Sequence, residues 1–150
     1  MQIMNNLFMQ KVIEDAQTVK NDIPVSALIV KNDEIICICH NQKEEKQNAT
    51  YHAEILAIEQ ASKILNSWRL DECDMYVTLE PCPMCAGAII QSRIKNLYFG
   101  SYDNLYGALG SKIDLRKIFN SSLNVKGGIM EEECNKVLNN YFERMRSAKN

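Results

Sequence analysis

The sequence predicts an α/β fold of three layers (α/β/α), in which helices cover both faces of a central mixed five-stranded sheet. Apolar patterns of helical period alternate with short β-branched runs over most of the chain. Near the amino terminus, two such runs are separated by only a two-residue turn, so they are expected to form an antiparallel hairpin, which makes the sheet mixed. At 150 residues and 46% hydrophobic, the chain can bury one core, and we expect a single domain over residues 1–150.

The first predicted elements are a helix and the hairpin. Apolar residues recur at helical spacing over residues 5–20, and the turn-forming residues 21–24 end this pattern. Residues 25–31 and 34–40 are rich in β-branched and apolar side chains, and Asn32-Asp33 turns the chain between them.

Helices and strands alternate over the rest of the chain. An apolar stripe predicts a helix over residues 52–65, with His52 and Glu54 in its first turn. Another helix continues from a cysteine turn, so that Cys82 and Cys85 lie at its start. The predicted elements after residue 65 are a strand at 74–79, a helix at 86–94, a strand at 96–100, a short helix within 109–119, a strand at 123–129 and a helix at 131–147.

Composition excludes several classes of protein. Residues 1–20 lack the basic start, uninterrupted apolar stretch and small-residue cleavage site of an export signal. No stretch approaches the roughly 20 apolar residues of a membrane span, so we expect a cytoplasmic protein without membrane contact. Its cysteines are then expected to be reduced, and Cys37, Cys39, Cys73 and Cys134 to be buried as small hydrophobes.

Two short motifs together predict a metal centre. His52-Ala53-Glu54 opens one helix, and Pro81-Cys82-Pro83-Met84-Cys85 opens the next. They supply three soft ligands and one carboxylate. A catalytic zinc takes three protein ligands and leaves its fourth position to water, whereas a structural zinc has four. We therefore expect one Zn²⁺ per subunit, held by His52, Cys82 and Cys85.

The same residues predict the reaction. His-x-Glu followed by Pro-Cys-x-x-Cys is the signature of zinc-dependent nucleobase deaminases. Zinc brings the pKa of a bound water toward neutrality, so that hydroxide can add to C6 of adenine or C4 of cytosine. The ring nitrogen must gain a proton during this attack, and ammonia must then leave. Glu54 is the acidic residue expected to shuttle both protons.

Two other interpretations remain open. A Cys-x-x-Cys at a helix start also suits a thioredoxin-like redox motif, although such a motif has no use for His52-x-Glu54. A structural zinc module, with no catalysis, would need a fourth ligand. Candidates for that ligand are His40, Cys37, Cys39, Cys73 and Cys134, none of which stands at paired ligand spacing.

Over nearly its whole length the chain resembles the bacterial tRNA-specific adenosine deaminases of the cytidine deaminase-like superfamily. Beyond the metal motifs, the resemblance rests on Pro24-Val25, Asn41, the run 76–82, the run 85–88, Ser92-Arg93-Ile94, Phe99-Gly100 with Asp103, Gly107-Ala108 with Gly110-Ser111, and Glu133-Cys134. It implies a homodimer without an organic cofactor. Its expected substrate is the wobble adenosine of an arginine tRNA anticodon stem-loop, which is turned out of the loop and converted to inosine.

The resemblance also implies roles for individual residues. Asn41 and Ala53 are expected to contact the base, and Asp103 to lie beside the ribose of a neighbouring nucleotide. The chain departs from the usual pattern at Ser26, where glycine is common, and at Tyr51 and Tyr102. A net charge of −2 does not favour bulk electrostatic binding of RNA. The main alternative substrate is therefore a free base or nucleoside, such as guanine or cytosine.

Overall fold

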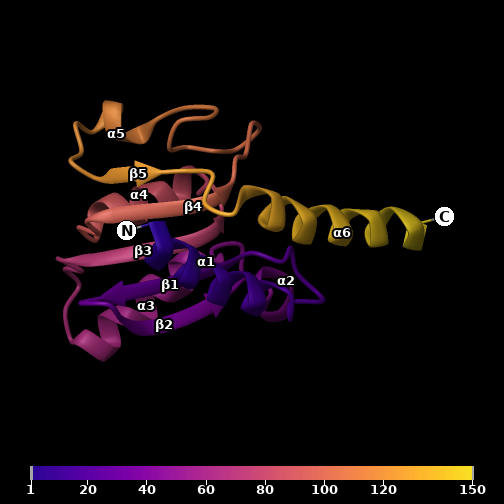
Figure 1. Cartoon of the computed structure of the whole chain (residues 1–150), viewed down its shortest axis with the longest axis horizontal. Coiled ribbons are helices and arrows are strands. Elements are labelled where there is room, and N and C mark those ends of the chain that lie inside the picture. Colours follow the sequence, from indigo (N-terminus) through magenta and orange to yellow (C-terminus); the bar gives the residue numbers. More distant parts are fainter. Residues whose placement is uncertain (1, 150) are drawn as a thin grey trace.

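The computed structural model describes residues 2–149, so the two terminal residues of the expected domain lie outside the description. Its sheet has five strands in the order β2-β1-β3-β4-β5 (Figure 1). β1 pairs antiparallel with both β2 and β3, whereas β3–β4 and β4–β5 are parallel. The predicted mixed sheet is thus confirmed. The strands are β1 (Ser26–Lys31), β2 (Glu34–His40), β3 (Cys73–Leu79), β4 (Asn96–Ser101) and β5 (Asn124–Lys126).

Helices cover the sheet on both sides, as predicted. α1 and α6 pack on one face and α3 and α4 on the other, while the far end of α6 extends beyond the sheet (Figure 1). The helices are α1 (Gln2–Ala16), α2 (Lys43–Lys46), α3 (Ala53–Leu65), α4 (Pro83–Gln91), α5 (Leu115–Ile118) and α6 (Glu131–Lys149). Among residues 2–149, none of these helices has the length and hydropathy needed to cross a bilayer.

The central strands bury both of their faces because successive side chains alternate across a sheet. On β1, Ala27 and Ile29 face the core beneath α3 and α4, whereas Leu28 and Val30 face the core beneath α1. The helices also direct their buried residues toward the sheet. On α3, Ala53, Ala57 and Ala61 form a face of small residues that lies close to the sheet.

Two segments differ from the prediction near the amino terminus. α1 ends at Ala16 rather than residue 20, and the Thr18 hydroxyl donates to the Asp15 carbonyl just past its end. α2 was not predicted. Its first turn is held by the buried Asp22 carboxylate, which accepts from the backbone N–H groups of Glu44 (2.8 Å) and Glu45 (3.2 Å).

The other differences concern element ends. α4 begins at Pro83, three residues before the predicted start, because proline suits the first helical position. It stops at Gln91, and Arg93 then takes a left-handed conformation (φ 68°) that turns the chain toward β4. The predicted helix within residues 109–119 is only the four-residue α5, and the strand at 123–129 is only the three-residue β5.

Candidate metal centre

The starts of α3 and α4 place the three predicted ligands. His52 is the N-cap residue of α3 and Cys82 that of α4, and Cys85 lies in the first turn of α4. Both N-cap residues have extended backbone, and neither side chain caps its own helix. The imidazole and both sulfurs are therefore available to bind an ion. Helix amino termini also favour anionic groups such as thiolates.

The separations between these side chains fit a tetrahedral zinc ion. His52 Nδ1 lies 3.6 Å from Cys82 Sγ and 3.5 Å from Cys85 Sγ, and all three ligand atoms lie within 4.8 Å of one another. With zinc–sulfur bonds of about 2.3 Å and zinc–nitrogen bonds of about 2.0–2.1 Å, tetrahedral angles separate nitrogen from sulfur by about 3.6 Å. The residues thus suit zinc, through Nδ1 of His52.

Among residues 2–149, no fourth side chain joins this group. The candidates for a fourth ligand are engaged elsewhere. Cys37 donates to the Ala57 carbonyl at 3.3 Å, Cys39 to Gln60 Oε1 at 3.0 Å, and His40 contacts Asp15. Cys37, Cys73 and Cys134 are buried, as predicted, but the prediction is wrong for Cys39, which is only half-buried. A structural zinc site therefore lacks its fourth ligand in the described part of the chain.

The thiols are unequal in their affinity for protons. The hydrogen bond from Cys85 lowers the pKa of Cys82 to about 4, and the His52 imidazole acts in the same direction. The pKa of Cys85 is raised, chiefly by the same contact with Cys82 and also by burial. The contact thus favours the thiolate form of Cys82, and metal binding would displace the proton of Cys85.

Glu54 is buried beside these ligands, with only 4% of its surface exposed. Burial raises its pKa to about 7. A group that alternately accepts and donates a proton works best when its pKa lies near the working pH. The environment of Glu54 therefore suits the predicted proton shuttle.

The buried position of Glu54 is expected to cost stability in the metal-free protein. Its folded pKa of about 7 exceeds the ordinary 4.5, so stability is lost as pH rises through this range. Glu54→Gln removes the cost. In urea unfolding of the metal-free protein, the free energy of unfolding of Glu54→Gln relative to wild type is expected to rise by about 2 kcal/mol between pH 5 and pH 8. An equal difference at both pH values would contradict this explanation.

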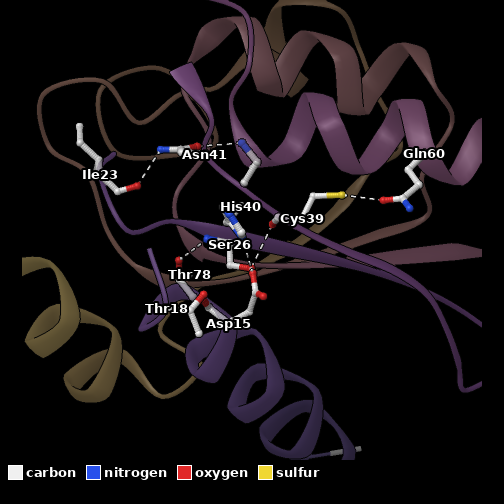
Figure 2. Close-up of polar contacts among 10 residues, drawn as sticks. Asp15, Thr18, Ile23, Ser26, Cys39, His40, Asn41, Gln60 and Thr78 are labelled. Atoms are coloured by element: carbon white, nitrogen blue, oxygen red, sulfur yellow. Dashed lines mark hydrogen bonds and ion pairs between the residues drawn. The ribbon is translucent and has the colours of Figure 1, made fainter. Parts of the chain in front are cut away.

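Asn41 connects the start of α3 to the segment before β1. Its Oδ1 accepts from the backbone N–H of Ala53 at 2.8 Å, and its Nδ2 donates to the Ile23 carbonyl at 3.1 Å (Figure 2). Asn41 and Ala53 thus lie next to His52 and Glu54. The side-chain amide of Asn41 retains a second N–H and a second lone pair that a base could contact. Contact with a base stays a prediction for both Asn41 and Ala53.

Asp103 lies in the loop after β4, half-buried. Its Oδ1 accepts from the backbone N–H groups of Leu105 and Tyr106, each at 3.0 Å. The backbone N–H of Asp103 donates to Oε1 of Glu80 at 3.1 Å. Glu80 lies two residues before Cys82 in the sequence. This contact ties the loop to the turn that carries Cys82 and Cys85, but a position beside a ribose stays a prediction. Sequence reasoning did not single out Glu80, although a lone acidic residue between an apolar strand and a metal turn was a usable signal.

Ser26, one of the three departures, has a specific local partner. Its buried hydroxyl donates to Asp15 Oδ2 at 2.6 Å, and the same oxygen lies 3.2 Å from His40 Nδ1 (Figure 2). The serine is thus accommodated by Asp15 at the end of α1. Tyr51 is half-buried, and the exposed Tyr102 packs edge-on against Phe99.

Comparison with known proteins identifies the family. The MafB19-like deaminase family matches residues 2–146. The chain is 40% identical over 149 residues to a tRNA-specific adenosine deaminase of Bacillus subtilis, an alignment that covers 97% of this chain and 92% of that protein. The chain belongs to the tRNA-specific adenosine deaminase family. Another family member, from Rickettsia felis, is 44% identical over 134 residues and is covered to 91%.

Solved structures agree with this membership. One of them comes from a study of A-to-I editing by tRNA deaminases at the wobble position of transfer RNA. It superposes on the present structure with a TM-score of 0.85 at 34% sequence identity. The match covers 88% of the present chain and 99% of the chain in that structure. The cytidine deaminase-like fold is thereby confirmed. A guanine deaminase of Bacillus subtilis is also 34% identical, but it matches only 64% of the chain and 63% of its own, with a TM-score of 0.60.

Proposed function

We propose that this protein hydrolyses the wobble adenosine of a tRNA anticodon loop to inosine, with an arginine tRNA as the expected substrate. The metal centre carries this proposal: one imidazole nitrogen and two sulfurs lie at tetrahedral spacing beside the buried Glu54, without a fourth ligand among residues 2–149. The adenosine deaminase relatives support the choice of adenosine in tRNA.

His52, Cys82 and Cys85 would hold one Zn²⁺ per subunit, and no organic cofactor is needed. When bound, zinc supplies a water molecule activated for attack at neutral pH. Glu54 would take one proton from the attacking water and deliver it to the ring nitrogen. It would then take the second proton from the hydroxyl added to C6 and deliver it to the exocyclic amino group, which leaves as ammonia while the C6 carbonyl forms. One water is consumed and one ammonia is released, so the reaction balances.

Asn41 and Ala53 would bind the base at the amino terminus of α3. Asn41 is half-buried, and a bound base would bury its amide. A buried amide without a partner costs about 1–3 kcal/mol, so such a pocket would reject bases that leave it unpaired. RNA recognition is proposed to be local, because the net charge of the chain is −2 and single-stranded loops are recognised largely by stacking and by contacts to base edges.

The proposed substrate is tested by offering RNA and small substrates to the same zinc-loaded protein. One reaction contains an arginine tRNA anticodon stem-loop with adenosine at the wobble position, and the others contain free guanine, cytosine, adenosine or cytidine. Inosine is expected in the stem-loop, with little ammonia released from the small substrates. Fast ammonia release from guanine or cytosine, with intact RNA, would refute the proposal in favour of a free-base deaminase.

We further propose that the chain is a single cytoplasmic deaminase domain that acts as a homodimer. The family match over residues 2–146 supports one domain.

The proposed homodimer is expected to use an apolar surface beside the metal-binding turn. A hollow of about 640 Å³ between α3 and α4 is lined by Ile58, Trp68 and Met84 among others, and we expect a second copy of the chain there. Sedimentation of a dimer at micromolar concentration supports this arrangement, and a monomer contradicts it.

A further inference from the structure

Glu80 is a buried acidic residue for which the proposed mechanism has no use. Only 2% of its surface is exposed. It directly follows β3, and its backbone N–H donates to the Ser101 carbonyl at 2.8 Å, which continues the pairing of β3 with β4. Cys82 is two residues further on. Because a buried carboxylate is very unfavourable unless it is hydrogen-bonded, the partners of Glu80 indicate what it does.

Among residues 2–149, the side-chain hydrogen bonds of Glu80 all come from one loop, residues 102–112. Oε1 accepts from the Asp103 N–H at 3.1 Å and from the Ser111 hydroxyl. Oε2 accepts from the N–H groups of Leu109 at 3.2 Å and Ser111 at 3.0 Å. Four hydrogen bonds thus surround the two oxygens of the Glu80 side chain. The Glu80 side chain thus joins Asp103, near the start of the loop, to Leu109 and Ser111, near its end.

The loop is packed closely around this carboxylate. A Cβ atom on Gly107 would lie 2.5 Å from Glu80 Cδ and 2.4 Å from the Asp103 carbonyl oxygen, so only glycine fits there. The Ala108 N–H also donates to the Pro81 carbonyl at 2.9 Å. The loop therefore rests on the residues that lead directly into the metal-binding turn.

The residues presented by this loop suit contact with unpaired RNA. Asp103 is oriented by the N–H groups of Leu105 and Tyr106. The side chains of Tyr102 and Tyr106 are 49% and 67% exposed, and exposed aromatic rings are surfaces on which unstacked bases pack.

We propose that Glu80 is a positioning residue, which holds loop 102–112 in the conformation that presents Asp103, Tyr102 and Tyr106 to the RNA beside the target base. This role rests on the proposed function, since it concerns binding of the same anticodon loop. Glu80 is absent from the group of ligand atoms formed by His52, Cys82 and Cys85, and its side chain bonds to the loop instead. Its loss is therefore expected to weaken RNA binding more than it slows the chemical step.

The test is Glu80→Gln in the zinc-loaded protein, with the anticodon stem-loop as substrate. Glutamine keeps the size of the side chain but replaces an acceptor oxygen with a donor, so part of the set is lost. We expect zinc content to stay at one per chain and KM to rise at least about tenfold, with kcat within about threefold of wild type. Amide hydrogen exchange at Asp103, Leu109 and Ser111 is expected to accelerate in parallel.

Two further variants keep the test decisive. Ser111→Ala removes only one donor and is expected to change KM in the same direction by a smaller factor, even if Glu80→Gln does not fold. Glu72→Gln, an exposed glutamate paired with Lys95, is the matched control and is expected to leave KM unchanged.

The outcomes separate this inference from the proposed function. Loss of zinc, or a fall in kcat at unchanged KM in Glu80→Gln, would show that Glu80 supports the metal turn instead and would overturn the inference. Unchanged kinetics and exchange would also overturn it. If the wild-type protein does not act on the stem-loop at all, the proposed function itself fails, and the role of Glu80 in RNA binding fails with it.

Discussion

Glu54→Ala is expected to lower deamination of the anticodon stem-loop by at least about 100-fold, the lower end of general acid-base contributions. Zinc content is expected to stay at one per chain, because Glu54 is absent from the group of ligand atoms formed by His52, Cys82 and Cys85. The measurement pairs inosine formation with metal analysis on the same samples, so that turnover and metal binding are seen to separate.

The matched control is Glu59→Ala. Glu59 lies on the same helix, but it is exposed and pairs with Lys63. This control variant is expected to retain wild-type activity and zinc. If Glu54→Ala instead loses its zinc stoichiometrically, Glu54 is a ligand and its assignment as proton shuttle is wrong.

Cys85→Ser is expected to remove the metal and destabilise the fold. The serine hydroxyl is a far poorer zinc ligand than a thiolate, and two remaining ligands cannot complete the centre. Because metal binding and folding are coupled, wild type gains about 4 kcal/mol when free zinc exceeds its Kd 1000-fold. Metal analysis and thermal unfolding in zinc buffer are expected to show both losses in Cys85→Ser.

Cys39→Ser serves as the control for this variant. Cys39 is half-buried and contacts Gln60, away from the ligand group. The Cys39→Ser variant is expected to keep both zinc and the wild-type unfolding temperature. Stoichiometric zinc and an unchanged unfolding temperature in Cys85→Ser would contradict the assigned ligand set.

The sheet and the longer helices could be predicted because their signals are local. Residues 25–31 and 34–40 are rich in β-branched and apolar side chains on either side of a two-residue turn. They form β1 and β2 within one residue of the expected bounds. The candidate metal ligands could also be predicted, since each motif opens a helix and its spacing already places its side chains together. That the two helices begin side by side follows from the parallel β3–α4–β4 unit and from α3 on the same face.

The remaining features depend on partners distant in sequence. α2 is held at its start by Asp22, about twenty residues earlier. Its own four residues suit a helix but carry no apolar stripe that would predict one. The loop after β4 is shaped by Glu80, which periodicity presents only as the residue after a strand. The buried hydroxyl of Ser26 needs Asp15 as its hydrogen-bond acceptor, and Asp15 lies close to Ser26 only once α1 has packed on the sheet.

The central claim is that three side chains hold a zinc ion whose fourth position is open beside Glu54. A crystal structure of the zinc-loaded protein, with anomalous diffraction at the zinc edge, tests it most directly. We expect zinc bound by His52 Nδ1, Cys82 Sγ and Cys85 Sγ, with solvent at the fourth position and Glu54 within hydrogen-bond distance of that solvent. A fourth protein side chain on the zinc, or Glu54 directed away from it, would contradict the catalytic account.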